Sequence, residues 1–214
     1  MSKNDKDKIS MSVIRRLPRY YRFLSELDSQ RAERISSTNL AKIMNVTASQ
    51  VRQDLNCFGG FGQQGYGYSV RQLKEEIGSI LGLGNGYRAI LIGAGHFGSA
   101  LANHLDFEKL GFSLIACFDK DSGKVGQQIG TLTVRDQSEL EAFCQSNRVD
   151  TAIFCIPKEA VEAELDRLYA LGIRSFWNFS HYDITRRYSD TVAENVHLSD
   201  MLMTLCYKMN NLNQ

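Results

Sequence analysis

Apolar side chains recur at steps of three and four residues between Met11 and Leu27, the spacing of one face of an amphipathic helix. Pro18 falls inside this pattern, so the helix is expected to begin near this residue or to bend there. Arginines are interleaved with the apolar positions and could contact phosphates from one helix: Arg15, Arg16, Arg19 and Arg22. The alternative is that these arginines only solvate the helix.

Two short helices are expected next. Ser36 to Thr38 supplies N-cap candidates for a helix over residues 39–44, and a tight turn follows it. Thr47 and Gln50 form a capping box, in which the hydroxyl accepts the Gln50 N–H and the Gln50 side chain reaches back. The helix that begins there has polar residues in its first turns. This pattern predicts a helix-turn-helix, whose second helix offers its first side chains to base edges in the DNA major groove.

A glycine-rich segment follows the second helix. Residues 59–68 hold five glycines and three aromatic residues, which suits a β-hairpin with a close-approaching tip, the wing of a winged helix. Ser69 and Gln72 form a second capping-box pattern before a helix with apolar residues on one face. Residues 82–86 are rich in glycine and read as a linker, so we place the end of the first domain at residue 84.

The pattern with the most chemistry lies in residues 87–119. A strand over 87–92 leads into the turn Gly93-Ala94-Gly95-His96-Phe97-Gly98, and a helix over 99–105 follows at once. A second strand over 113–118 ends at Asp119. Strand, glycine turn, helix, strand and acid make up the dinucleotide-binding fingerprint in its structural context.

Each part of the fingerprint has a physical role. Gly93 allows the tight turn, Gly95 lets the backbone approach a pyrophosphate, and Gly98 lets the helix pack on the strand. The helix N-terminus offers unpaired N–H groups to phosphates. Asp119 can accept from ribose hydroxyls, which favours NAD(H) over NADP. The alternative is a Rossmann-type domain that has lost its ligand.

The rest of the chain extends this α/β pattern. Ser138 is expected to cap another helix. Further elements are expected as a buried strand over 151–156, a helix over 157–171 and strands over 173–179 and 191–196. Residues 198–212 form a last helix with an apolar stripe. That stripe needs cover, which the domain's own sheet or a second subunit could supply.

Composition suits a folded protein, and its charge is unevenly distributed. The chain has 214 residues, 43% of them hydrophobic, with no apolar run near the roughly 20 residues that span a bilayer. Met1 to Ser10 has no apolar signal core, so we expect a cytoplasmic protein. Residues 1–80 carry 13 Lys or Arg and 8 Asp or Glu, a net +5, whereas residues 81–214 carry 12 and 16, a net −4. A basic front half suggests a polyanionic partner, with a chance imbalance as the alternative.

The five cysteines are widely spaced and form no CxxC pair. Most lie in apolar runs, where a cysteine behaves as a small core residue, with a thiol redox switch as the alternative.

The chain resembles the Rex family of redox-sensing transcriptional repressors. The resemblance extends over nearly the whole sequence and rests on ordered stretches, several outside any generic fingerprint. They include Val51-Arg52-Gln53-Asp54-Leu55, Gly65-Tyr66-Gly67-Tyr68, Gly93-Ala94-Gly95, Phe118-Asp119-Lys120-Asp121, Lys124-Val125-Gly126, Ala170-Leu171-Gly172-Ile173, Asn178-Phe179 and Glu194-Asn195-Val196.

The resemblance implies a winged helix-turn-helix over residues 1–84, a Rossmann-type parallel-sheet domain over 85–196 and a dimerisation helix over 197–214 that is exchanged between subunits. It also implies a homodimer that binds double-stranded operator DNA when NAD⁺ is high and releases it when NADH accumulates. The fingerprint and the resemblance together give two sets of expected contacts. For NAD(H) they are Gly93, Ala94, Gly95, His96, Phe97, Gly98, His104, Asp119, Lys120, Lys124, Pro157, Asn178 and His197. For DNA they are Arg15, Arg16, Arg19, Thr47, Ser49, Gln50, Arg52, Gln53, Gln63, Gln64 and Tyr66.

The sequence departs from the family pattern both among the expected DNA contacts and among the expected NAD(H) contacts. Gln53, Gln63 and Gln64 stand where relatives carry basic residues, which lowers the expected phosphate affinity and salt dependence. His104 and His197 replace a Tyr and an Asp that help relatives distinguish the nicotinamide states, and His96 replaces an Arg. These histidines could act as neutral hydrogen-bond partners or as a pH-tuned switch. A metal site would need a third ligand and is not expected.

Three functions are compatible with these patterns. The first is a dinucleotide-responsive repressor in which a hinge near residues 82–86 changes the spacing of two recognition helices. The second is a diverged DNA-binding paralogue with a weak or lost NADH response. The third is an NAD-dependent oxidoreductase, which leaves residues 11–80 unexplained and only 130 residues, 85–214, for catalysis. We therefore expect a regulator without enzymatic activity.

Overall fold

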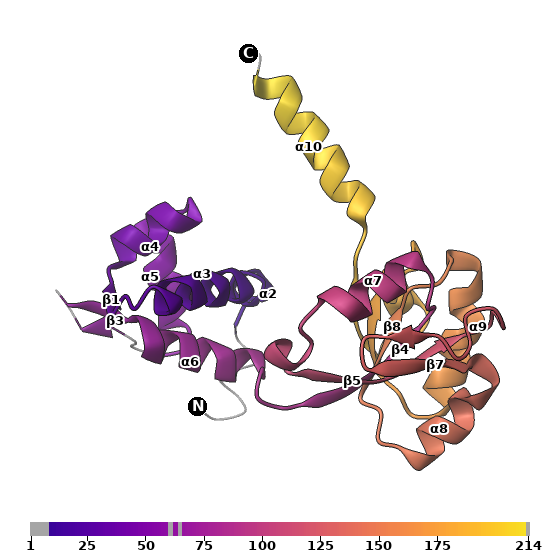
Figure 1. Cartoon of the computed structure of the whole chain (residues 1–214). Coiled ribbons are helices and arrows are strands. Elements are labelled where there is room, and N and C mark those ends of the chain that lie inside the picture. The colour runs from indigo at the N-terminus through magenta and orange to yellow at the C-terminus, as the bar shows by residue number, and fades with distance from the viewer. Residues whose placement is uncertain (1–8, 60–61, 64–65, 213–214) are drawn as a thin grey trace. The chain divides into compact units, whose positions relative to one another are not determined.

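The computed structural model describes residues 9–59, 62–63 and 66–212 (Figure 1). The chain forms two compact units, Met1–Gly84 and Asn85–Gln214, which divide inside the glycine-rich segment. Each unit has its own hydrophobic core. We therefore treat the two units separately.

The first unit is a small helical bundle beside a three-stranded sheet. Its elements are α2 (Met11–Ile14), α3 (Leu17–Ser29), β1 (Arg34–Ile35), α4 (Ser37–Met44), α5 (Ala48–Asn56), β2 (Gly62–Gln63), β3 (Gly67–Ser69) and α6 (Val70–Leu81). The strands pair antiparallel in the order β1-β3-β2. Apolar residues of α3, α4, α5 and α6 pack together in the core. The winged helix-turn-helix expected from the sequence is confirmed, and Gln64, an expected DNA contact, lies outside the described residues.

Local signals explain where these helices begin and end. Pro18 lies in the first turn of α3, where a backbone N–H has no partner within the helix, so proline loses no hydrogen bond there. The helical pattern is interrupted between α2 and α3, just before Pro18. Ser36 accepts the Asn39 N–H at 3.1 Å, so α4 begins at residue 37 rather than at the expected residue 39. Asn45 ends α4 in the left-handed conformation, with a φ of 50°.

The second unit is a seven-stranded, mostly parallel sheet with helices on both faces. Its strands are β4 (Tyr87–Ile92), β5 (Phe112–Asp119), β6 (Gln128–Ile129), β7 (Leu132–Asp136), β8 (Thr151–Phe154), β9 (Ser175–Asn178) and β10 (Val192–Asn195). Its helices are α7 (His96–His104), η1 (Glu108–Leu110), η2 (Gln137–Glu139), α8 (Leu140–Ser146), α9 (Lys158–Ala170), η3 (Ile184–Arg186) and α10 (Leu198–Leu212). The strand order is β10-β9-β8-β4-β5-β7-β6, and only β6 runs antiparallel to its neighbour. The expected Rossmann-type sheet is confirmed.

The alternation of side chains along β4 shows how the sheet is covered. Ile90 and Ile92 point into a core shared with α8 and α9, whereas Ala89 and Leu91 point into a core shared with α7. Successive side chains of a strand face opposite sides, so an unbroken apolar run is what a sheet buried on both faces requires. Figure 1 shows α7 on one side of the sheet and α8 on the other.

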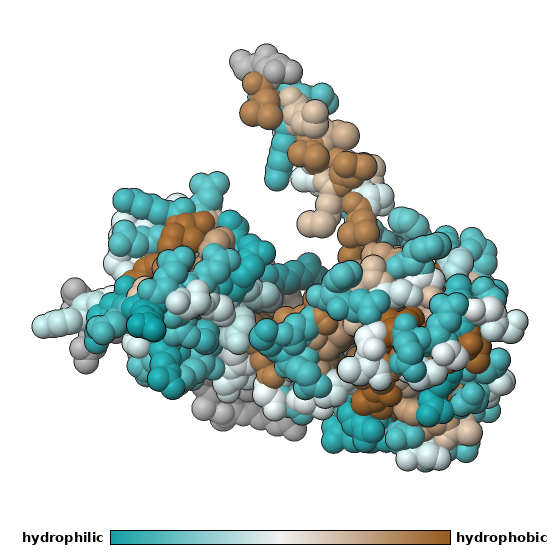
Figure 2. Space-filling model, in the orientation of Figure 1, coloured by the Kyte–Doolittle hydropathy of each residue, from teal (hydrophilic) through white to brown (hydrophobic). Residues whose placement is uncertain are grey.

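One expectation in this unit was wrong in detail, and one open alternative is decided. Ser138 does not cap a helix; Asp136 does, because its Oδ1 accepts the Ser138 N–H at 2.8 Å and starts the 3₁₀ turn before α8. Of the two alternatives left open for covering the apolar stripe of the last helix, the structure does not show the first, cover by the domain's own sheet. No residue of α10 is buried, and Met201 and Leu202 are 72% and 63% exposed. Figure 2 shows apolar side chains along this helix.

Within the part of the chain that the structure describes, no helix is both long and apolar enough to cross a bilayer.

Candidate functional site

The glycine turn between β4 and α7 is shaped by close backbone contacts. Gly93 has a φ of +100°, and a Cβ there would lie 2.6 Å from the Cys155 carbonyl oxygen. A Cβ on Gly98 would lie 2.0 Å from the Gly93 carbonyl oxygen. Only glycine fits at either position, because real Cβ atoms do not approach backbone so closely.

Gly95 differs from Gly93 and Gly98 because the space beside it is open. A Cβ there would meet only the Lys124 Nζ atom, at 4.0 Å. Gly95 is also the N-cap of α7, and no side chain caps that end of the helix. The first N–H groups of a helix have no partner within it, and the helix dipole makes that end positive. The turn therefore leaves room for an anionic group such as a phosphate.

Asp119 fixes the turn from the end of β5. Its Oδ2 accepts the Ala94 N–H at 2.8 Å and the Lys124 ammonium at 3.3 Å, and its Oδ1 accepts the Asp121 N–H at 2.9 Å. Asp119 is 6% exposed, so these bonds lie almost entirely out of solvent. Lys120, the next residue, is exposed.

The carboxyl ends of neighbouring strands bring further expected residues to this place. Strand β4 lies in the middle of the sheet, with β5 on one side and β8 on the other. The chain fills the β5 side first and then returns to the β8 side, so the strand order reverses at β4. Ligands of open α/β sheets bind at such a switch point. Pro157 follows β8 and is exposed, and His96 is exposed at the start of α7. Phe97 is 43% exposed and meets the Phe179 ring edge-on at 4.9 Å.

Asn178 has a different role from the expected cofactor contact. Its side chain is fully buried, and its Nδ2 donates to the Tyr182 carbonyl and to Asn195 Oδ1. Its Oδ1 accepts the Ser180 N–H at 3.0 Å and the Ser180 hydroxyl at 2.7 Å. Because both ends of the amide are used inside the protein, Asn178 ties β9 to β10 and the following loop instead of facing a ligand.

The other two expected histidines lie at helix ends. His104 is the last residue of α7 and is exposed, about 12 Å along the helix from its first residue at 1.5 Å per residue. His197 lies just before α10, with its ring stacked on His181 at 5.5 Å and 4° between planes. Its Nδ1 is buried and has no partner among the described residues. Sequence reasoning missed His181, because nothing in its local pattern marks it.

The helix-turn-helix presents a polar face. Thr47, Ser49, Arg52 and Gln53 are exposed on or beside α5, and Gln50 is half-buried. Arg15 and Arg19 are also exposed, near the start of α3. The wing residue Tyr66 is 71% exposed, and Arg34 donates to its carbonyl oxygen at 3.2 Å. Gln63 lies in strand β2 of the wing.

Arg16 differs from the other arginines, which corrects its expected role. Its Nε and Nη2 donate to the two oxygens of Asp54, both at 2.7 Å, and Asp54 is 1% exposed.

A second correction concerns the capping box, because the Gln50 side chain does not reach back to Thr47. The Thr47 hydroxyl accepts the Gln50 N–H at 3.1 Å, but the Gln50 amide donates to Asp54 at 2.8 Å.

The Asp54 carboxylate is ionised in this environment. Burial raises the pKa of Asp54, but hydrogen bonds from Arg16, Gln50 and Tyr20 outweigh it and hold the pKa below its usual value. Burial and the neighbouring Asp54 charge raise the pKa of Tyr20, which stays a donor.

The remaining candidate chemistry is limited. Among the described residues, no cluster of three or more His, Cys, Asp or Glu side chains could hold a metal ion. Burial raises the pKa of the Cys117 thiol to about 11 and that of Cys155 to about 12, which keeps both protonated. Cys57 and Cys206 are exposed, not core residues.

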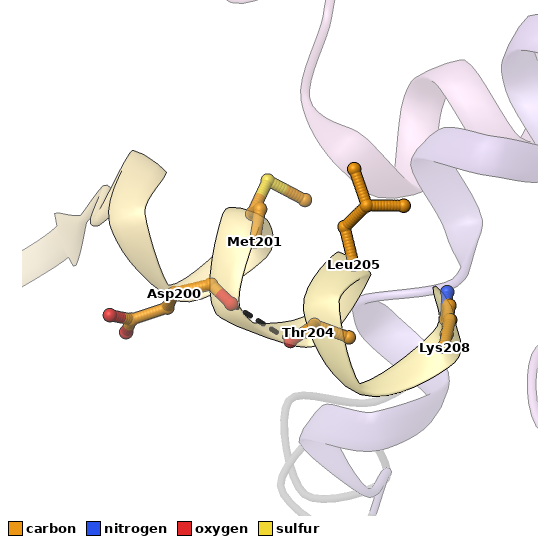
Figure 3. A pocket seen from close by; sticks show the side chains of 5 residues that line it. All are labelled: Asp200, Met201, Thr204, Leu205 and Lys208. Atoms are coloured by element: carbon orange, nitrogen blue, oxygen red, sulfur yellow. Dashed lines mark hydrogen bonds between the residues drawn. The ribbon is translucent and has the colours of Figure 1, made fainter. Parts of the chain in front are cut away.

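A hollow on α10 is a feature of one helix surface (Figure 3). It is lined by Asp200, Met201, Thr204, Leu205 and Lys208, all from α10. The Thr204 hydroxyl bonds back to the Asp200 carbonyl at 2.8 Å, so it is satisfied within the helix. Residues of the sheet do not contribute to this hollow, and its apolar lining belongs to the uncovered stripe.

Comparisons with known proteins find matches for both units. Residues 8–56 match the family model "Putative DNA-binding protein N-terminus", and residues 85–182 match the "CoA binding domain" model. The "Redox-sensing transcriptional repressor Rex" of Thermoanaerobacter pseudethanolicus is 50% identical over 96% of this chain and 91% of its own length. The crystal structure of RSP in complex with NAD⁺ and operator DNA matches with a TM-score of 0.88 and 48% identity, covering 96% of this chain and 94% of RSP. RSP in complex with NADH also matches with a TM-score of 0.88, at 45% identity and 96% coverage of both chains. The chain belongs to the Rex family of redox-sensing transcriptional repressors.

Proposed function

We propose that this chain is a repressor that binds operator DNA as a homodimer and releases it when NADH binds. The observation that carries the proposal is the pairing, in one chain, of an exposed helix-turn-helix with an open glycine turn. Relatives of nearly the same length are redox-sensing repressors, and solved complexes of one relative hold NAD⁺ with operator DNA or NADH.

The residues of the glycine turn fit a dinucleotide. The open space beside Gly95 and the uncapped start of α7 suit the pyrophosphate, with His96, Phe97 and Lys124 close by. Asp119 and Lys120 at the end of β5 suit the ribose hydroxyls of the adenosine half. Pro157 lines the β8 side, where the rest of the dinucleotide would extend.

The proposed DNA face combines the first turns of α5 with the wing and the exposed arginines. The major groove would be contacted by residues on or just before α5: Thr47, Ser49, Gln50, Arg52 and Gln53. Arg15, Arg19 and the wing residues Gln63, Gln64 and Tyr66 would contact the flanking backbone or minor groove. Two such faces, one in each subunit, would read an operator with two half-sites.

The uncovered α10 supports the homodimer. Its apolar side chains are at least half exposed in the single chain, which is costly in water unless a second subunit covers them. We propose that α10 packs on a second copy of the chain. A linker over residues 82–86 would then let the bound nucleotide change the separation of the two recognition helices.

The proposal excludes enzymatic turnover. The named relatives are repressors, and the 130 residues after position 84 form one cofactor-type sheet domain with the terminal helix.

The alternative within the family is a paralogue with a weak NADH response. The specific observation that favours it is the pair of histidines, His104 and His197, at positions where the resemblance leads us to expect Tyr and Asp.

The test is operator binding titrated with NADH, NAD⁺ and coenzyme A. The proposal expects NADH to release the DNA at concentrations where NAD⁺ does not, and coenzyme A to have no such effect. Equal binding in all three conditions would reject redox sensing by this chain. Retained DNA binding without NADH binding by calorimetry would select the paralogue.

A further inference from the structure

The Asp54 carboxylate joins three segments of the helix-turn-helix unit. It is 1% exposed and accepts four hydrogen bonds: from Arg16 Nε and Nη2 at 2.7 Å each, from the Tyr20 hydroxyl at 3.0 Å and from Gln50 Nε2 at 2.8 Å. Arg16 lies between α2 and α3, Tyr20 lies on α3, and Gln50 lies in the first turn of α5. A buried charge is tolerated only when such donors compensate it, so all three partners are held in place together.

Gln50 stands at the position from which a recognition helix reaches DNA. It is the third residue of α5 and is half-buried, four residues before Asp54 on the same face of the helix. Within the part of the chain that the structure describes, the bond to Asp54 is the only hydrogen bond of its side chain. The Oε1 atom and the second N–H of the amide are therefore free for a ligand.

A glutamine amide with these two free groups matches one base. Adenine presents the N7 acceptor and the N6 amino donor in the major groove, and a Gln amide pairs with both. A free Gln side chain loses rotamer entropy when it binds, whereas an amide already held in place loses less. The bond to Asp54 also settles which end of the amide carries the nitrogen, since a carboxylate accepts only from N–H.

We propose that Asp54 is a positioning residue for DNA recognition, which holds the Gln50 amide in the orientation that reads an adenine. Asp54 itself does not touch the DNA. This assignment rests on the proposed DNA face and names the base class that one residue of that face would select.

The experiment is a mutational cycle on the full-length protein with NAD⁺. The probe is a duplex enriched from a randomised library by the wild-type protein, compared with a scrambled duplex of equal length. Q50A is made in the wild-type protein, in D54N and in R16M/D54L. The last variant replaces the buried ion pair by apolar side chains, an exchange that cores often tolerate, so the cycle stays readable if D54N does not fold.

The assignment predicts that Q50A lowers the preference for the enriched duplex about 5- to 150-fold in the wild-type protein, the range for one bidentate base contact. In the D54N and R16M/D54L backgrounds, Q50A should lower this preference less than about twofold, because Asp54 no longer holds the Gln50 amide in place. A core variant that is merely less stable, L24V, should retain the full effect of Q50A. With the wild-type protein, replacing one adenine per half-site by 7-deazaadenine should reproduce the loss.

An equal Q50A effect on all backgrounds would overturn the positioning role, and so would a wild-type protein indifferent to Q50A. A wild-type protein that enriches no sequence at all would instead reject the proposed DNA-binding function, and the assignment with it.

Discussion

At the scale of single residues, the three glycines of the turn have different roles that the structure separates. Gly93 and Gly98 are required by the backbone itself, since added Cβ atoms would collide with carbonyl oxygens. Gly95 has ordinary extended backbone, with a φ of −69°, and open space beside it. The fold itself therefore does not require a glycine at position 95.

Gly95→Ala should therefore fold normally and bind NADH at least about tenfold more weakly, because the methyl group occupies the space of the pyrophosphate. Gly98→Ala is the matched control, and its Cβ 2.0 Å from the Gly93 carbonyl should lower the thermal midpoint markedly. Calorimetry and thermal unfolding distinguish the two. NADH affinity unchanged in Gly95→Ala would show that the cofactor does not approach this turn.

Asp54 gives a pH dependence with a definite sign. Its folded-state pKa is depressed, so its contribution to stability is present above the unfolded pKa of about 4 and is lost as pH falls through the lower folded value. As the pH is lowered below about 5, thermal unfolding should show wild-type stability falling more steeply than that of D54N. Parallel curves for the two proteins would mean that Asp54 is not ionised in the folded state.

At the scale of elements, the sequence predicted those whose signals are local. The fingerprint strand and helix, the capped α5 and the glycine-rich wing all follow from residues within one turn or hairpin. Two donors to Asp54, Arg16 and Tyr20, lie 38 and 34 positions away from it, and could not be predicted. The same holds for Asn195, which accepts from the Asn178 amide 17 positions away. Contacts across such separations depend on how elements pack, which periodicity does not encode. The short antiparallel strand β6 was missed for a related reason, since two residues carry no period.

The last helix is the element that the rest of the described chain leaves uncovered, and we propose that a second copy covers it. Leu202→Glu with Leu205→Glu places two charges in its apolar stripe, and burying these in a subunit interface is costly. We expect a monomer by light scattering, with operator affinity reduced at least about tenfold because the two half-sites are no longer bound together.

Asn210→Glu on the same exposed helix is the control and should remain dimeric. A stable dimer of the double variant would place the subunit interface elsewhere.

At the scale of the whole molecule, the account depends on two units that influence each other. One unit carries the open glycine turn and the other the groove-reading helix, and they divide near residue 84. If NADH lowers operator affinity by some factor, operator DNA must lower NADH affinity by the same factor, because the two equilibria form a closed cycle. The size of that factor depends on the contacts each ligand makes in each state.

The most direct measurement is the NADH dissociation constant of the full-length dimer with and without saturating operator duplex. We predict that operator DNA weakens NADH binding by the same factor, about 5- to 150-fold for a typical coupling, by which NADH weakens operator binding. The NAD⁺ constant should change much less in the same experiment. Identical NADH affinities with and without operator DNA would contradict the account, because the nucleotide and the DNA would then be bound independently.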